Sequence, residues 1–317
     1  MPLMFSSDVI DGFLLIFQTC IGVAGNLVLL EAYVYTFLIQ PHLKKPIDVI
    51  FMHLTAVNIL TILFTLIPDI MSSLRARHFL DDVGCKVILY IFRISRGLSI
   101  CTTSLLSAFQ AITISPSGSK CAWLKSKLSA CIFPSFLFFW AINMLIYIYI
   151  IETVGTRSNI TISHKYAHPH CQTRQFGDHH LGSFLSVIML RDVFFVVLMV
   201  WMSLYMVNHL CRHHRRARPI HSSSLPCQTP PENKAIHTIL LFVSCFVFFC
   251  CSNNLFTFYS LYTPKKNPRF KMLCGILSTC YPTICPFVLM KNNKIISRFT
   301  SSLSVIRTIF SQRASTG

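Results

Sequence analysis

The sequence predicts an all-α membrane protein, a bundle of seven transmembrane helices, on three observations. The chain contains seven apolar stretches, each about as long as the roughly 20 residues that a helix needs to cross a bilayer. Hydrophobic residues make up 53% of the chain and charged residues 12%, whereas a soluble domain carries about 25% charged residues. The stretches are also continuous, whereas the strands of a membrane barrel alternate between apolar and polar residues.

The seven helices are expected to follow one another in a single domain that comprises residues 1–317. Most basic residues lie between the apolar stretches and so delimit them; the predicted ranges are about 10–38, 47–71, 85–112, 128–151, 184–208, 235–261 and 269–290, followed by a short basic tail at 291–317. No Lys or Arg precedes the first helix, so we expect it to act as the insertion signal and not as a cleaved signal peptide. Pro231 and Glu232 suit the first turn of the sixth helix.

Two prolines, Pro282 and Pro286, lie inside the predicted seventh helix. Proline kinks a helix, and a kink of this kind is a plausible hinge for a bundle that switches between two states. The alternative is static packing, in which water or neighbouring side chains fill the gap.

The distribution of basic residues predicts the orientation. The first, third and fifth connections and the tail carry more Lys and Arg than the other connections, which places the amino terminus outside and the tail in the cytoplasm. The long connection at about 152–183 is then outside, and it contains the triplet Asn159-Ile160-Thr161, a glycosylation sequon. The net charge is +17, and the basic residues that produce it are expected to contact anionic lipid headgroups and not nucleic acid.

Two of the 14 cysteines stand apart from the apolar stretches. Cys85 lies at the outer end of the third helix and Cys171 lies in the long outer connection. Both face the oxidising side, so we expect a disulfide between them, with two free thiols as the alternative.

Two arginines inside the third helix are the first candidates for ligand recognition. A charge within the membrane is costly and marks function by default, and Arg93 and Arg96 share one face of the helix because they are three residues apart. Arg96 lies eleven residues beyond Cys85, or about 16 Å along the helix at 1.5 Å per residue. This distance places Arg96 at a depth in the bundle where a small ligand could be held. The alternative is a structural bond to backbone carbonyls, Asp69 or Asp192.

Aromatic residues in the outer halves of the helices are further candidates, because small-molecule pockets are mostly apolar. The candidates are Tyr90, Phe92, Phe256 and Tyr259; the alternative for each is packing or contact with lipid.

Other polar residues are expected to be structural. The neighbours Arg191 and Asp192 are expected to point to different faces, so that each needs its own partner or an aqueous cavity, and Asp192 is expected to pair across helices. Asn26 and Asn58 are expected to make contacts between helices.

The end of the fifth helix carries a basic cluster that includes Arg212, Arg215 and Arg216. These residues could contact a cytoplasmic protein or anionic lipid, or simply anchor the cytoplasmic side. His209 and His213 are four residues apart, but nothing around them completes a tetrahedral metal site, and no cofactor is expected.

Three long segments resemble the vomeronasal type-1 receptor family. They are Gly97–Pro116 in the third helix, His221-Ser222 leading to Pro231–Ala235, and Cys280–Met290 in the seventh helix. The resemblance runs from the first helix to the tail. Ordinary rhodopsin-like receptors differ at two places, because Phe109-Gln110-Ala111 replaces Asp-Arg-Tyr and Cys285–Leu289 replaces Asn-Pro-x-x-Tyr. Gly25-Asn26 is similar to their Gly-Asn pair.

The resemblance implies a G-protein-coupled receptor in the plasma membrane of sensory neurons. It implies pheromone-like small molecules as ligands and an inhibitory-class (Gi/Go) heterotrimeric G protein as partner. Phe109 and Gln110 stand where such receptors face the G protein, and the basic cluster with Arg212, Arg215 and Arg216 is a further candidate for that contact.

Two other function classes remain as alternatives. A bitter-taste-type chemosensory receptor has the same architecture, and a small-molecule transporter or channel is less favoured because the chain shows no repeats or interrupted helices. We do not expect an enzyme, since the chain has no metalloprotease, hydrolase or phosphate-loop motif.

Overall fold

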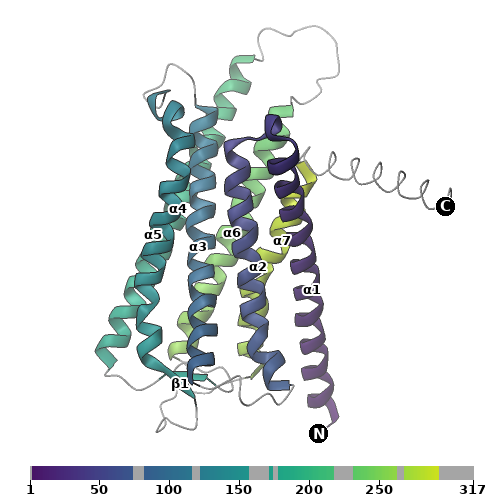
Figure 1. Cartoon of the computed structure of the whole chain (residues 1–317), viewed down its shortest axis with the longest axis vertical. Coiled ribbons are helices and arrows are strands. Elements are labelled where there is room, and N and C mark those ends of the chain that lie inside the picture. Colours follow the sequence, from purple (N-terminus) through teal and green to yellow (C-terminus); the bar gives the residue numbers. More distant parts are fainter. Residues whose placement is uncertain are drawn as a thin grey trace, which may run out of the picture.

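The described part of the chain forms seven long helices that run side by side as an elongated bundle (Figure 1). This computed structural model describes residues 2–73, 82–115, 122–156, 171–173, 178–217, 231–262 and 268–292. The helices are α1 Pro2–Ile39, α2 Pro46–Ser73, α3 Asp82–Ile114, α4 Ala122–Thr153, α5 Asp178–Ala217, α6 Pro231–Tyr262 and α7 Pro268–Asn292, with a short 3-10 helix, η1, at Pro41–Leu43. The predicted fold class, an all-α membrane bundle, is confirmed.

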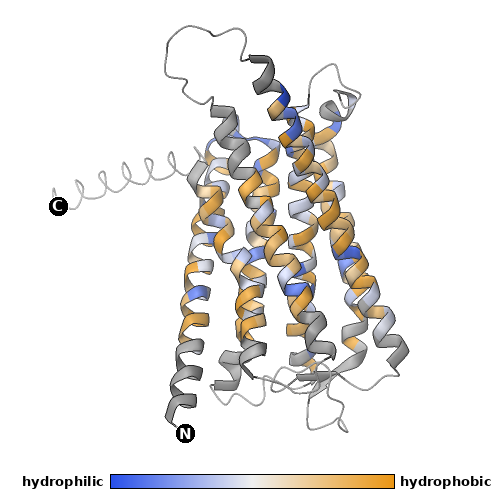
Figure 2. Ribbon diagram, turned by 180° about the vertical axis from the view of Figure 1, so that it is seen from behind, coloured by the Kyte–Doolittle hydropathy of each residue, from blue (hydrophilic) through white to orange (hydrophobic). Residues whose placement is uncertain are grey.

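The helices are apolar and long enough to cross a membrane. Among the described residues, six of them contain a stretch of at least 18 residues with the hydropathy of a membrane span, and α6 contains a shorter apolar stretch, Val243–Phe256. Hydrophobic residues predominate along the length of the bundle (Figure 2). Each observed helix includes its predicted range and extends beyond it, because backbone hydrogen bonding continues past the apolar stretch. The 40 residues of α5, for example, span about 60 Å, which exceeds the roughly 30 Å of the hydrocarbon core.

The third helix lies at the centre of the bundle. It packs against α2, α4 and α5, whereas α1 packs against α2 and α7, and α6 against α7 and α5. In consequence 72% of the spanning stretch of α3 is buried, against 28% of that of α4. Side chains such as Leu137 and Leu190 are about three-quarters exposed in the isolated chain. In a membrane these side chains face lipid.

A short β-hairpin that was not predicted from the sequence lies at one end of the bundle (Figure 1). Strand β1, Val154–Thr156, pairs antiparallel with β2, Cys171–Thr173, so that Thr156 lies opposite Cys171. Strand β1 lies against α3, near the end where α1 begins (Figure 1). The backbone of Cys171 is therefore in a hairpin that packs on the helix carrying Cys85. The side chains of both cysteines, and all of Asn159, lie outside the described residues, so the disulfide and the glycosylation remain predictions.

Glycines allow α1 and α7 to pack closely. A Cβ atom on Gly22 would lie 2.6 Å from Oγ1 of Thr283, and one on Gly25 would lie 3.2 Å from Cγ of Pro286. Next to them, Asn26 donates from Nδ2 to the carbonyl oxygen of Pro282 at 2.9 Å. Small residues that bring backbones together, with polar side chains bonding across the seam, are typical of helix packing in membranes. The predicted contact of Asn26 between helices is confirmed.

The second predicted contact is also present. Ser99 on α3 donates from Oγ to Oδ1 of Asn58 on α2 at 3.3 Å. Both residues are buried, so this bond ties the central helix to its neighbour inside the bundle.

Candidate ligand-binding site

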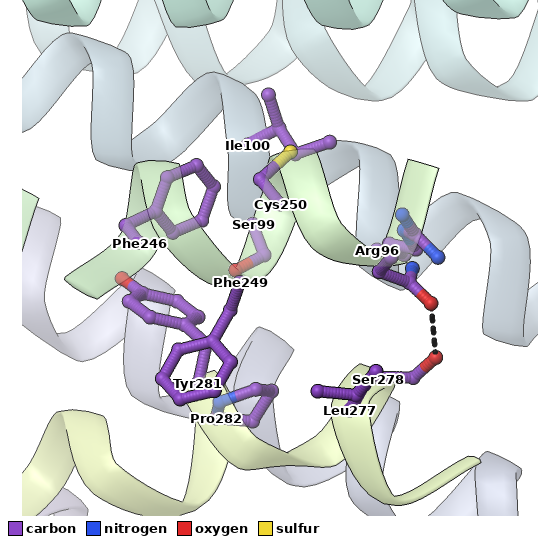
Figure 3. A pocket seen from close by; sticks show the side chains of 11 residues that line it. Arg96, Ser99, Ile100, Phe246, Phe249, Cys250, Leu277, Ser278, Tyr281 and Pro282 are labelled. Carbon is purple, nitrogen blue, oxygen red and sulfur yellow. Dashed lines mark hydrogen bonds between the residues drawn. The ribbon is translucent and has the colours of Figure 1, made fainter. Parts of the chain in front are cut away.

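A pocket lies between α3, α6 and α7 (Figure 3). It contains about 370 Å³ of empty space, counting the part that is open to solvent. Its walls are formed by Arg96, Ser99 and Ile100 of α3, by Phe246, Phe249, Cys250 and Asn253 of α6, and by Leu277, Ser278, Tyr281 and Pro282 of α7.

Polar groups converge on one side of the pocket around Arg96. Its guanidinium donates from Nη2 to Oδ1 of Asn254 at 3.0 Å. The side-chain amide of Asn253 lies between Arg96 and Ser278, 3.0 Å from the hydroxyl of Ser278. Turning the amide so that its nitrogen faces Ser278 and its oxygen faces the guanidinium satisfies both neighbours, and we assign this orientation. Arg96 and Ser278 lie on the same side of the pocket in Figure 3. Hydrogen bonds through Arg96 and Asn253 therefore link α3, α6 and α7.

Apolar groups form the other side. The ring of Tyr281 packs edge-on against Phe246, with ring centroids 4.4 Å apart, and its hydroxyl lies 3.1 Å from Oγ1 of Thr103. Phe249, Ile100 and Leu277 complete this wall. An apolar wall with a few convergent polar groups is the usual composition of a small-molecule site, and this pocket has that composition.

Of the ligand candidates whose side chains the structure describes, Arg96 is the one that lines this pocket. Arg93 is half-buried, and its guanidinium carbon lies 5.9 Å from the centroid of the Phe92 ring. Tyr90 donates from its hydroxyl to the carbonyl oxygen of Met144 at 3.1 Å, which places it between α3 and α4. Phe92 and Phe256 are half-buried and do not line the pocket.

The side chain of Tyr259 lies outside the described residues. For Arg93, Tyr90, Phe92 and Phe256, a ligand role would require a site other than this pocket.

Sequence reasoning missed the partners of Arg96. Asn253 and Asn254 form an adjacent amide pair in the middle of an otherwise apolar stretch of α6. Polar residues of this kind are costly in a membrane and need partners, which was a signal available from the sequence. If Arg96 had a structural role, the partners expected for it were carboxylates or backbone carbonyls. Its observed side-chain partners are neutral amides.

The prediction for Arg191 and Asp192 is wrong in one respect. These neighbours on α5 do not take separate partners, because the guanidinium turns back and donates from Nη2 to Oδ1 of Asp192 at 2.5 Å. The guanidinium also reaches α4: Nη1 donates to Oδ1 of Asn143 at 2.7 Å, and Nη2 donates to the hydroxyl of Tyr147 at 2.9 Å. The long arginine side chain makes this possible, since it spans the separation that successive helical positions impose.

Gly97 on α3 makes room for this cluster. A Cβ atom at Gly97 would lie 1.9 Å from Oδ1 of Asn143 and 2.7 Å from Nη1 of Arg191. Arg191 and Asp192 are both buried. A buried ion pair is tolerated only when its remaining hydrogen-bonding groups also have partners, and α4 supplies them here.

Comparison with known proteins agrees with the geometry. Residues 10–302 match the model of the vomeronasal organ pheromone receptor family. The chain is 36% identical over 276 residues to vomeronasal type-1 receptor 4 of Pongo pygmaeus, covering 86% of this chain and 91% of that protein. It is 33% identical over 287 residues to vomeronasal type-1 receptor 4 of Homo sapiens, covering 89% and 94%. It is also 30% identical over 293 residues to olfactory receptor class A-like protein 1 of Danio rerio, covering 90% of each.

The chain belongs to the vomeronasal type-1 receptor family. This vomeronasal receptor is accordingly a multi-pass protein of the plasma membrane. Its family is one of membrane receptors and not of enzymes.

The residues expected to face the G protein occupy different environments in this vomeronasal receptor. Phe109 and Gln110 of α3 are both buried. Arg212 of α5 is exposed, whereas the side chains of Arg215 and Arg216 lie outside the described residues. In this conformation Phe109 and Gln110 are therefore covered by the neighbouring helices, and a partner would reach them only after those helices move apart.

The predicted hinge lies within α7, which contains both Pro282 and Pro286. Pro286 has no backbone N–H, so the carbonyl of Pro282, four residues earlier, loses its partner in the helix. Asn26 supplies a donor to that carbonyl from α1. The weak point of α7 is thus bonded to a neighbouring helix, and its role as a hinge remains a prediction.

Proposed function

We propose that this receptor detects pheromone-like small molecules in the pocket at Arg96 and signals through an inhibitory-class (Gi/Go) heterotrimeric G protein. The observation that carries the proposal is the guanidinium of Arg96, which lines a pocket at the junction of three helices in a chain of the pheromone receptor family. We propose the orientation that the basic residues predict, with the amino terminus outside. The hairpin end then faces the ligand and the other end the G protein.

The expected mechanism is a shift between two arrangements of the bundle. A ligand that binds one arrangement more tightly raises its population, and a G protein that prefers the same arrangement is coupled to the ligand by that preference. The pocket is suited to this role because its walls belong to α3, α6 and α7, so that a bound molecule contacts three helices at once.

The test is expression of the receptor with an inhibitory-class G protein and a screen of steroids, volatile compounds and urine fractions. We expect a response that pertussis toxin abolishes. Arg96→Met is expected to reduce that response at least tenfold in potency at unchanged surface expression, because the ligand loses its donor. Arg93→Met is the matched control, since Arg93 has the same chemistry on the same helix but does not line the pocket.

Other results would overturn the proposal. An unchanged dose–response in Arg96→Met would exclude contact between the ligand and Arg96. A ligand-dependent current without any G protein would favour the transporter or channel class instead. Family membership favours a vomeronasal receptor over a bitter-taste-type receptor.

A further inference from the structure

Arg96 is held by two consecutive side chains of α6 that no motif assigned to the site. Asn254 accepts from Nη2 of the guanidinium at 3.0 Å, and the oxygen of the Asn253 amide also faces the guanidinium. The hydroxyl of Ser278 donates its single proton to the carbonyl of Cys274 at 2.7 Å. The hydroxyl must therefore accept from Asn253, which orients the amide oxygen of Asn253 toward Arg96.

Within the described part of the chain, these contacts give the charge of Arg96 no counterion. Among the described residues no carboxylate forms an ion pair with Arg96, and both of its side-chain partners are neutral amides. By contrast, Arg191 pairs with Asp192. The bonds from Arg96 to the two amides lack the attraction between opposite charges that an anionic acceptor would add, so an incoming anionic acceptor group can displace an amide from Arg96.

We propose that Asn253 and Asn254 are positioning residues that tie α6 to α3 through Arg96 in the ligand-free receptor, and that the acceptor group of a ligand replaces them and releases α6. This rests on the proposed function, in that it takes the pocket at Arg96 as the ligand site. It adds that occupation of the site and separation of α3 from α6 are one event. The ligand competes with a bond between helices.

Displacement of the amides from Arg96 would also affect the contact between α6 and α7. Asn253 bonds to Ser278 as well as facing Arg96, so that movement of Asn253 changes the contact between α6 and α7. Ser278 lies four residues before Pro282, whose missing N–H leaves the carbonyl of Ser278 without a helical partner. The link from Arg96 therefore ends where α7 has lost a backbone hydrogen bond.

Two substitutions at one position test the proposal in opposite directions. Asn254→Leu keeps the size of the side chain but removes the acceptor, and we expect ligand-independent signalling to rise several-fold. Asn254→Asp gives Arg96 a charged acceptor, and we expect basal signalling to fall and the ligand concentration for half-maximal response to rise about tenfold. Cys251→Ala is the matched control, because Cys251 lies on the same helix with its side chain exposed at the bundle surface.

The outcomes separate this proposal from the proposed function. If the wild-type receptor responds to a ligand but both Asn254 variants have wild-type basal activity and potency, the tie is disproved while the function stands. If no ligand or G protein gives any signal, the tie is decided by thermal unfolding of the purified receptor in detergent, with Arg96→Met, Asn254→Leu and the double variant. We expect the double variant to melt no lower than the less stable single variant; additive losses would disprove the tie.

Discussion

The side chain of Asn26 in α1 donates a hydrogen bond to the backbone carbonyl of Pro282 in α7 at 2.9 Å, across 256 positions of sequence. The acceptor is available because Pro286 has no N–H to offer it. The same Nδ2 also donates to the carbonyl of Gly22 at 2.7 Å. One buried amide thus donates to an acceptor in each of two helices, at a position where α7 has lost a backbone hydrogen bond.

Replacing Asn26 with Leu is expected to destabilise the receptor, because the carbonyl of Pro282 then remains buried without its donor. Losing a buried partner costs about 1–3 kcal/mol, although hydrogen bonds within membranes average nearer 0.6 kcal/mol. We expect the melting temperature in detergent to fall by a few degrees. Asn26→Leu combined with Pro286→Ala should recover much of the loss, since alanine restores the helical donor. No recovery would mean that Asn26 acts elsewhere.

Replacing Gly97 with Ala is expected to disrupt the cluster between α3, α4 and α5. The added methyl group would lie 1.9 Å from Oδ1 of Asn143, so the amide must leave its bond to Arg191. Overpacking of this kind costs about 1–3 kcal/mol or more, and we expect a strong loss of surface expression. Gly275→Ala is the control, because nothing lies within 4 Å of a Cβ atom at that position. Equal expression of the two variants would contradict the close approach at Gly97.

The pair Arg191 and Asp192 gives a prediction about single and double variants. Removing one partner of a buried ion pair costs about 3–5 kcal/mol, whereas removing both is often much cheaper. Asp192→Asn and Arg191→Met should each lower the melting temperature more than the double variant Arg191→Met with Asp192→Leu does. Thermal unfolding of the three variants checks this order. A double variant that is the least stable of the three would show that the two side chains do not act as a pair.

The predicted disulfide can be tested by a double-mutant comparison. If Cys85 and Cys171 are bridged, Cys85→Ala, Cys171→Ala and the double variant should lose the same amount of stability, since each removes one covalent link of about 2–4 kcal/mol. Reducing agent should lower the melting temperature of the wild type and leave that of the variants unchanged. Independent losses from the two single variants would favour two free thiols.

The part of the fold that follows from composition could be predicted. A segment that crosses lipid must satisfy its own backbone, so a long apolar stretch has to be a helix. This reasoning predicted the seven helices and the fold class. The hairpin β1–β2 could not be predicted in this way, because three-residue strands have no periodicity of their own and form only where a neighbouring element supports them.

The candidate site could likewise be predicted only in part. Arg96 was identifiable because a charge in an apolar stretch stands out along the chain. Its partner Asn254 lies 158 positions away, and no spacing rule relates the two. The joining of Arg191 to its neighbour Asp192 was also beyond sequence reasoning, because it depends on the conformation of a flexible side chain and on the space that Gly97 leaves.

The sequence by itself determined that this protein is a seven-helix membrane bundle of the vomeronasal type-1 receptor family, because hydropathy and local motifs are properties of contiguous residues. Only the tertiary structure decided which polar side chains meet. The amides of Asn253 and Asn254 face Arg96, and that of Asn26 bonds to the carbonyl of Pro282. Such contacts depend on the rotation and depth of each helix relative to its neighbours, which the packing of the whole bundle sets.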